Sequence, residues 1–458
     1  MLRKVTAIAL VTGLIMALAL VLAPVRSVSA QQGIQWSTGF QVQNLGTAQA
    51  TVDIRLINPD GTSAANILGE SIAAGSSKTY FPIPSVETGF SGSAVIEADQ
   101  PVAAILNILG NNGVAGQPFY SEAATGLTQG ATTVNLPLIQ RGNSGFDTWF
   151  AVQNAGTAAA PVTVVFTPGP GANDGTADTV TSAAIAPGAS LVFDQSTRTE
   201  LGTRFVGSAQ ITSAQPVAVV VNQVGKAGFQ TQLTYSGFAA GSTEVVLPLV
   251  QQANAGFFSG ISIQNIGTAA ADVTVAYGAN TVADGVSLTN ETFNLGAGAS
   301  QAIIVNGADR YIGSAIVTSA QPIVVVVNQL STQFGTSYEG ISSAGATTRV
   351  SLPLLMANNG GFFTAVQCRN AGTVSTTATM TFTPNAVPGS TTTPEPETAE
   401  LAAGQSVTWF QNAKIPTERY IGGATVTTSP ASNVVCIVNQ LAPANAGDAF
   451  LTYNGINF

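Results

Sequence analysis

The stretch Gln43-Asn44-Leu45-Gly46-Thr47 decides the fold, because it returns three times along the 458-residue chain. Its asparagine recurs after 110, 111 and 105 residues. Two other markers keep the same order: a Gly-Ser-Ala segment (Gly-Ala in the last copy) and an asparagine that closes an apolar run. Three markers repeated four times in one order indicate a tandem repeat of a single unit. The turn recurs at Gln153–Thr157, Gln264–Thr268 and Arg369–Thr373. The Gly-Ser-Ala segment lies at Gly92–Ala94, Gly207–Ala209, Gly313–Ala315 and Gly423-Ala424, and the asparagine that closes the apolar run is Asn107, Asn222, Asn328 or Asn439.

The repeat length predicts a small all-β domain. Residues 257–264 alternate between apolar and polar, and short runs follow at 273–277, 291–295, 301–305, 313–318 and 323–328, with Gly-, Asn- or Pro-containing turns between them. Such spacing is typical of a β-sandwich. We expect an all-β chain of four tandem immunoglobulin-like β-sandwich domains at 31–126, 127–240, 241–344 and 345–458. The last three open with Leu-Pro-Leu, at 136–138, 247–249 and 352–354, and the first lacks this opening strand.

Three segments of the second repeat carry a resemblance to a known class. Residues 152–157, 161–167 and 186–190 resemble the bacterial Ig-like repeats of cell-adhesion-related surface proteins. The resemblance extends over all four repeats and implies extracellular display, adhesion or structural spacing. It rests on turn and strand signatures, so it carries no catalytic residue onto this chain.

The N-terminus and the charge pattern restrict location and partners. Arg3 and Lys4 precede an apolar stretch, and Val28-Ser29-Ala30 is a small-residue cleavage site, so residues 1–30 are predicted to be a signal peptide. An uncleaved membrane anchor is the alternative; after cleavage no membrane span is expected. We expect a secreted, extracellular or cell-surface protein. The net charge is −9, and only 8% of residues are charged. No dense basic face can form, so nucleic-acid binding is not expected.

Few residues suggest chemistry. The chain has no histidine, which removes the commonest general base and zinc ligand. No acidic pair recurs across the repeats, so neither an enzyme nor a cofactor is expected. Asn173, Asp174 and Asp178 have a spacing that could hold calcium, although Asp174-Gly175 also reads as a turn.

The two cysteines both fall in the fourth repeat. Cys368 aligns with Val42, and Cys436 aligns with Ala104, so both replace apolar core residues. We expect a disulfide that joins the two sheets of this domain, with two buried free thiols as the alternative.

One strand is apolar on both faces in every repeat: 102–106, 217–221, 323–327 and 434–438. Its outer side, with Ala103, Ile105, Val324 and Val326, is therefore expected to be covered by neighbouring side chains, the next domain or another molecule. An open edge in the first domain, or these stripes, would permit self-assembly into an array or filament.

The leading functional hypothesis is a structural or adhesive surface protein, with other copies of itself, surface glycans or proteins as partners. The alternative is an extracellular carbohydrate- or protein-binding module, in which Trp36, Trp149 and Trp409 could stack on sugars. The C-terminal segment 451–458 ends in an aromatic residue, as in outer-membrane β-barrels, but the long repeat and the non-alternating runs disfavour that class.

Overall fold

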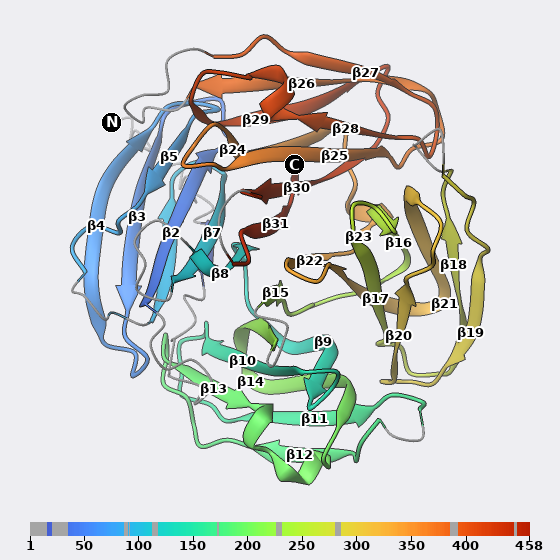
Figure 1. Cartoon of the computed structure of the whole chain (residues 1–458). Helices are drawn as coiled ribbons and strands as arrows, with labels where there is room; N and C mark the ends of the chain where they lie inside the picture. Colours follow the sequence, from blue (N-terminus) through green and yellow to red (C-terminus); the bar gives the residue numbers. More distant parts are fainter. Residues whose placement is uncertain are drawn as a thin grey trace, which may run out of the picture.

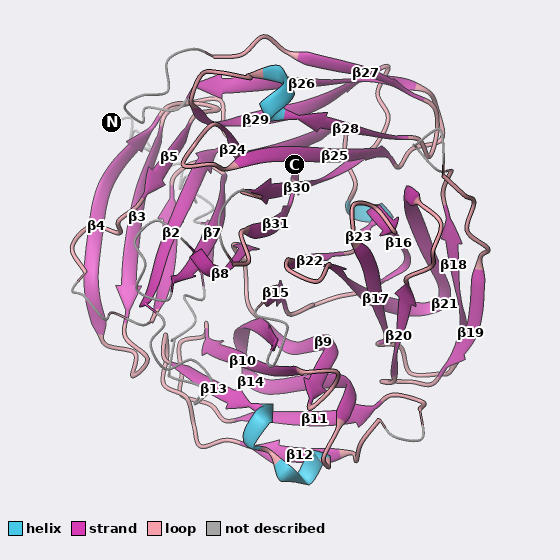
Figure 2. Ribbon diagram, in the orientation of Figure 1, coloured by secondary structure: helices cyan, strands magenta, loops and turns pink. Residues whose placement is uncertain are grey.

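The computed structural model describes residues 16–20, 35–86, 90, 92–111, 118–171, 174–225, 231–279, 285–384, 393–443 and 447–458. These residues form an all-β protein with several sheets, a few 3-10 turns and one short helix, α1 (Gln411–Lys414) (Figure 2). We call the segments 31–126, 127–240, 241–344 and 345–458 repeats 1 to 4. Each contributes its own hydrophobic core cluster.

The strands follow the same order in every repeat, as the spacing of the sequence markers predicted. Repeat 1 contains β2 (Gln35–Asn44), β3 (Ala50–Ile57), β4 (Ser63–Ile72), β5 (Ser77–Tyr80), β6 (Ser93–Ala98), β7 (Val102–Asn111) and β8 (Pro118–Thr125). Repeat 2 contains β9 (Ala131–Arg141), β10 (Phe146–Asn154), β11 (Val162–Pro168), β12 (Asp178–Thr181), β13 (Ser190–Asp194), β14 (Phe205–Gly225) and β15 (Gln232–Ser236).

Repeats 3 and 4 add a short strand after the same series. Repeat 3 contains β16 (Ser242–Gln252), β17 (Phe258–Asn265), β18 (Ala271–Tyr277), β19 (Glu291–Leu295), β20 (Ser300–Val305), β21 (Tyr311–Leu330), β22 (Gly335–Glu339) and β23 (Ile341–Ser342). Repeat 4 contains β24 (Arg349–Ala357), β25 (Phe363–Asn370), β26 (Thr376–Pro384), β27 (Glu397–Leu401), β28 (Ser406–Phe410), β29 (Tyr420–Ser429), β30 (Val434–Leu441), β31 (Phe450–Asn454) and β32 (Ile456–Asn457).

Repeats 1 and 4 each form two separate sheets. In repeat 1 the orders are β1-β6-β3-β4, where β1 (Met16–Leu20) precedes the repeat, and β5-β2-β7-β8; in repeat 4 they are β27-β26-β29-β24-β32 and β28-β25-β30-β31. In repeats 2 and 3 the corresponding strands are linked, because the long strands β14 and β21 pair with strands of both groups. Alternating side chains build the cores: in β3, Val52, Ile54 and Leu56 are buried while Thr51 and Arg55 are exposed.

The repeated asparagine shapes the same turn each time. In repeat 2, Nδ2 of Asn154 donates to the carbonyl oxygens of Ala158 and Ile185, both at 2.8 Å. Its Oδ1 accepts from the backbone N–H of Gly156 at 2.9 Å. Asn44, Asn265 and Asn370 bond in the same way in their own repeats. The repeated asparagine therefore stabilises the turn by forming hydrogen bonds with backbone groups that would otherwise be buried without a partner.

The four repeats form a closed ring (Figure 1). Strands β8, β15, β22 and β31 meet at its centre, each in contact with the next. Repeat 4 closes the ring on repeat 1: Oγ of Ser77 donates to the carbonyl oxygen of Pro353 at 3.2 Å, and Ser351 donates to Gln43. The Gly-Ser-Ala segment contributes to the three other interfaces: Oγ of Ser93 accepts from Gln153 at 2.6 Å, Oγ of Ser208 donates to Gly298 at 2.8 Å, and Oγ of Ser314 accepts from Arg369 at 2.5 Å.

Ring closure covers the strand that is apolar on both faces. Ala103, Ile105, Val324 and Val326 are all buried, which confirms that the outer side of this strand is covered. The preceding repeat around the ring provides the cover: Ile105 joins the core cluster of repeat 4, Val326 that of repeat 2 and Ile437 that of repeat 3. These stripes are therefore used within one chain, and self-assembly between copies cannot rely on them.

Repeat 1 obtains its opening strand from an unexpected place. It lacks the Leu-Pro-Leu sequence, yet β1 (Met16–Leu20) pairs with β6 where β9, β16 and β24 pair in the other repeats. Leu20 lies opposite Ala94, as Leu136 lies opposite Ala209. The strand comes from the predicted signal peptide. Among the described residues, no helix is long and apolar enough to span a membrane.

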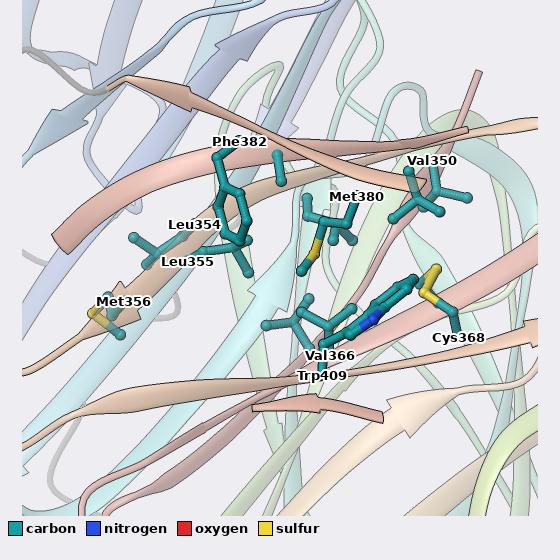
Figure 3. Packing of buried hydrophobic residues seen from close by; sticks show 14 of the residues in the cluster. Val350, Leu354, Leu355, Met356, Val366, Cys368, Met380, Phe382 and Trp409 are labelled. Atoms are coloured by element: carbon teal, nitrogen blue, oxygen red, sulfur yellow. A yellow bond between two sulfur atoms is a disulfide. The ribbon is translucent and has the colours of Figure 1, made fainter. Parts of the chain in front are cut away.

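Cys368 and Cys436 form the predicted disulfide and are fully buried in the core of repeat 4 (Figure 3). The expectation that it joins two sheets is wrong. The two residues lie directly opposite each other on the neighbouring strands β25 and β30 of one sheet, with Cα atoms 4.1 Å apart. The alignment with core positions was correct, but both aligned positions belong to the same sheet in every repeat, as Val42 opposite Ala104 shows.

Candidate binding grooves between the repeats

The calcium interpretation gains no support from the structure. Asn173 lies outside the described residues. The Asp174 carboxylate instead forms an ion pair with Arg204 at 2.8 Å, and Asp178 pairs with Arg198. Across the described ranges, no three Asp, Glu or Cys side chains gather in a way that could hold a metal ion.

The tryptophans do not form the suggested sugar platform. Trp149 and Trp409 are buried, Trp409 in the core of repeat 4 beside the disulfide (Figure 3) and Trp149 in a second apolar cluster of repeat 2 with Ala151 and Ala218. The side chain of Trp36 lies outside the described part of the structure. Sequence position alone could not separate a stacking tryptophan from a core tryptophan, because both lie on alternating strands.

Among the described residues, grooves lie instead at two places where neighbouring repeats meet. The groove between repeats 4 and 1 has a volume of about 340 Å³ and a mainly apolar lining. One wall is the end of β24 with the following hairpin, and the other is the β2–β5 edge of repeat 1. Its lining includes Leu354, Met356, Asn359, Phe362, Arg419 and Ile421 from repeat 4, and Gly39, Phe40, Gln41, Thr79, Phe81, Asn107 and Leu109 from repeat 1.

The groove between repeats 2 and 3 uses the same positions of the repeat. The wall that repeat 4 supplies in the first groove comes here from repeat 2, with Leu138, Gln140, Asn143, Phe146, Arg204 and Val206. The wall that repeat 1 supplies there comes here from repeat 3, with Gly260, Ala302, Ile304 and Asn328. Its larger hollow has a volume of about 450 Å³. Asp174 lines this groove together with Arg204, so the former calcium candidate belongs to the groove wall.

A large apolar side chain stands exposed on the lip of each groove. Phe81 is 58% exposed and Ile304 is 60% exposed. Phe410 occupies the same repeat position in repeat 4, opposite Ala365, and is 51% exposed. Glycine at the facing position makes room for the lip: a Cβ on Gly39 would lie 2.9 Å from Cδ2 of Phe81. The same position of the repeat therefore carries an exposed apolar side chain in three of the four repeats.

The seam between repeats 1 and 2 differs from the two grooves. Trp149 stands where the grooves have Gly39 and Gly260, and it packs against Leu127, Val192 and Ala218. The lip position there is Asp194, which caps a short 3-10 turn through Ser196. A buried aromatic side chain therefore stands at the position that is glycine in the two grooves.

The opposite rim of each groove is polar. Nε of Arg419 donates to Oδ1 of Asn359 at 3.0 Å, and Nε of Arg204 donates to Oδ1 of Asn143 at 3.1 Å. Both asparagines begin tight Asn-x-Gly-Phe hairpins; Ser144 has a positive φ of 50°, which the compact turn imposes on a non-glycine residue. Each groove thus combines an apolar lip with a guanidinium and an amide.

Reciprocal amide pairs join neighbouring repeats at three of the four interfaces, including the two that form the grooves. Nδ2 of Asn328 donates to Oε1 of Gln223 at 2.7 Å, and Nε2 of Gln223 donates back to Oδ1 of Asn328 at 3.1 Å. Asn439 pairs with Gln329, and Asn107 with Gln440, in the same way. The asparagines were sequence markers, but the partner role of the following glutamine was missed. The Asn-Gln dipeptide in repeats 2, 3 and 4 was the available signal; repeat 1 has Asn107-Ile108.

Comparison with known proteins gives no family. No family model matches the chain, and no curated protein matches it. Among solved structures, "Crystal Structure of Thermotoga maritima 1070" is 18% identical and covers 24% of this chain and 94% of that chain, with a TM-score of 0.21. CBD12 from CALX1.2 is 10% identical over 42% of this chain and 75% of that one (TM-score 0.10). The GH78 family rhamnosidase of Bacillus sp. GL1 is 10% identical over 87% and 52% (TM-score 0.14). Likeness at these TM-scores carries no argument about this chain.

Proposed function

We propose that this protein is a non-catalytic, exported adhesion protein, built from four Ig-like β-sandwich repeats, that binds a partner protein through the grooves between its repeats. The observation that carries the proposal is the exposed lip, Phe81 and Ile304, standing over a preformed hollow at the same position of two interfaces. An apolar side chain of a partner can bury the lip and fill the hollow, while the Arg–Asn rim offers hydrogen bonds to its backbone.

The way in which the repeats of the ring are joined supports this role. Walls from two repeats line each groove, and the amide pairs hold those walls together, so the grooves exist before a ligand arrives. Preformed sites lose less conformational entropy on binding. Two equivalent grooves on one rigid ring also allow a partner with repeated apolar segments to bind at both, which raises its apparent affinity.

A random peptide library displayed on phage tests the proposal. The full chain is expected to enrich peptides with large apolar residues, and the variant Phe81→Ser/Ile304→Ser/Phe410→Ser is expected to lose that enrichment. The matched control is Leu68→Ser/Val374→Ser, which removes side chains of similar exposure that line neither groove. Equal enrichment by the triple variant and the wild type, with both folded by circular dichroism, would exclude the grooves as the binding site.

A carbohydrate partner is the second candidate. The favouring observation is that Phe81 lies in one groove with Thr79, Gln41 and Arg419, which combines an aromatic face with hydrogen-bonding groups. A glycan array probed with the wild type and the Phe81→Ser variant separates the two: saturable glycan signals that need Phe81, without peptide enrichment, would favour the carbohydrate reading.

A further inference from the structure

A buried glutamate contacts the central strands of all four repeats. Glu122 lies on β8, and its Oε1 accepts from the backbone N–H of Ala123 at 2.8 Å and from Oγ1 of Thr336 at 2.9 Å. Its Oε2 accepts from the N–H of Thr234 at 2.9 Å, and the N–H of Thr452 points at Oε1 from 3.5 Å. The side chain is fully buried. One carboxyl group therefore joins β8, β15, β22 and β31.

A second buried carboxyl group lies beside the first. Asp448 precedes β31, and its Oδ1 accepts from the N–H of Gly335 at 3.2 Å. The backbone N–H groups of Gln232 and Phe450 also bond to this carboxyl group. Oγ of Ser121 donates to the backbone carbonyl of Asp448 at 2.6 Å, so the residue again contacts all four central strands. Its Oδ2 is buried and has no partner within the described residues.

The groups that face this pair supply no positive charge in the described part of the chain. β15 and β22 present Thr234, Thr336 and backbone N–H groups. Tyr120 on β8 faces Asp448, and Glu339 at the far end of β22 is a partly buried acid, bonded to the N–H of Ser236 at 2.6 Å. Lys226 lies outside the described residues. Two ionised carboxylates here would be costly, because both side chains are fully buried and no arginine or lysine among the described residues faces them.

Burial raises the pKa of the Glu122 carboxyl well above its usual value of 4.5. Burial also raises the pKa of Asp448 well above 3.8, and the charge of Glu122 adds to that effect. Backbone N–H groups oppose both shifts without cancelling them. A surrounding shell of donors also argues against a bound cation, since N–H groups repel one.

We propose that this axial carboxyl pair, Glu122 and Asp448, is a proton-dependent lock: protons held by the pair keep the four central strands together, and their loss loosens the ring. The proposal is independent of the grooves, since it concerns only how the ring is held.

The direction with pH follows from linkage. Above pH 4.5 an unfolded chain has lost these protons, while the folded ring keeps them until the raised pKa is reached. In that window the folded state binds more protons, so stability falls as pH rises. Each retained proton increases the unfolding equilibrium constant about tenfold per pH unit. The lock's stabilisation is complete below the unfolded-state values and is lost as pH rises through the folded-state values.

The test is urea unfolding of the full chain at a series of pH values from 4 to 9. The wild type is expected to be most stable near the acid end. Glu122→Gln and Asp448→Asn cannot hold the proton, so each should flatten the pH dependence by up to one proton. Glu97→Gln is the matched control, because this glutamate lies on the surface of repeat 1 in a pair with Arg55, and its variant should keep the wild-type slope.

Infrared spectroscopy covers the case in which a variant fails to fold. The wild type should retain the carbonyl stretch of a protonated carboxylic acid at neutral pH. A Lys226→Met variant checks for a hidden counter-charge; it should leave the slope unchanged. Any of three outcomes would overturn the proposal. The first is a free energy of unfolding that is flat or rises between pH 5 and 8, and the second is the absence of a protonated carboxyl band at neutral pH. The third is a changed pH dependence of stability in Lys226→Met.

Discussion

The reciprocal amide pairs offer the sharpest test of how the ring is held. In the pair between repeats 2 and 3, Gln223 is fully buried and Asn328 nearly so. Replacing Gln223 by leucine removes the acceptor for Nδ2 of Asn328 and for Nε2 of Gln140, which bonds Oε1 of Gln223 at 3.0 Å. Each buried donor left without a partner costs about 1–3 kcal/mol, and the added apolar surface offsets part of this. We expect Gln223→Leu to lower the free energy of unfolding by about 3 kcal/mol.

A double-mutant cycle separates the pair from simple packing. Replacing both partners by apolar residues of similar shape leaves fewer orphaned groups, so Gln223→Leu/Asn328→Leu should be destabilised by less than the sum of the single variants. Urea unfolding followed by tryptophan fluorescence measures all four proteins, with exposed Gln49→Leu as the surface control. Additive effects in the cycle, or a loss below about 0.5 kcal/mol for Gln223→Leu, would refute the role assigned to the pair.

Three further predictions concern the interface between repeats 1 and 2 and the disulfide of repeat 4. Ile108→Gln should cost less than about 1 kcal/mol in urea although Ile108 is buried, because it can supply a partner for the buried Nδ2 of Asn222, which has none among the described residues; a loss as large as that of Ile108→Ala would contradict this. Trp149→Gly should cost about 3–5 kcal/mol and create an apolar hollow there, which binding of an apolar fluorescent dye would detect. Cys368→Val/Cys436→Ala, which copies repeat 1, should lose up to about 4 kcal/mol in the chain-entropy model, and chemical reduction of the wild type should reproduce the loss.

Sequence reasoning succeeded where the answer was local. The alternation of apolar and polar residues indicated the strands, and the Asn-x-Gly turns could be recognised because Asn154 bonds to the nearby backbone of Gly156 and Ala158, although its third bond, to Ile185, is not local. Burial of Ile105 and Val326 was predictable, since a strand with two apolar faces needs two covers. Which part of the molecule covers the outer face of this strand could not be predicted, because the sequence of one repeat does not show that another repeat of the same chain packs against it.

The failures share a physical cause. The disulfide was placed between sheets because the spacing of 68 residues resembles an immunoglobulin bridge, but spacing does not say which strands are neighbours. The grooves and the axial pair arise where residues from different repeats meet, as with Gly39 and Phe362 or Glu122 and Thr336. Glu122 occupies a position held by Leu233 and Leu451 in repeats 2 and 4, so no repeated pattern pointed to it.

Closure of the ring affects how the chain is made. The contacts that complete it join residues more than 300 positions apart, such as Asn107 and Gln440, which are separated by 333. A chain that emerges from its N-terminus therefore presents the uncovered apolar strand β7 throughout the synthesis of repeats 2 and 3. Only the arrival of repeat 4 shields it. During that interval the nascent protein resembles an aggregation-prone intermediate, and a holdase that recognises β7 would protect it until the last repeat docks.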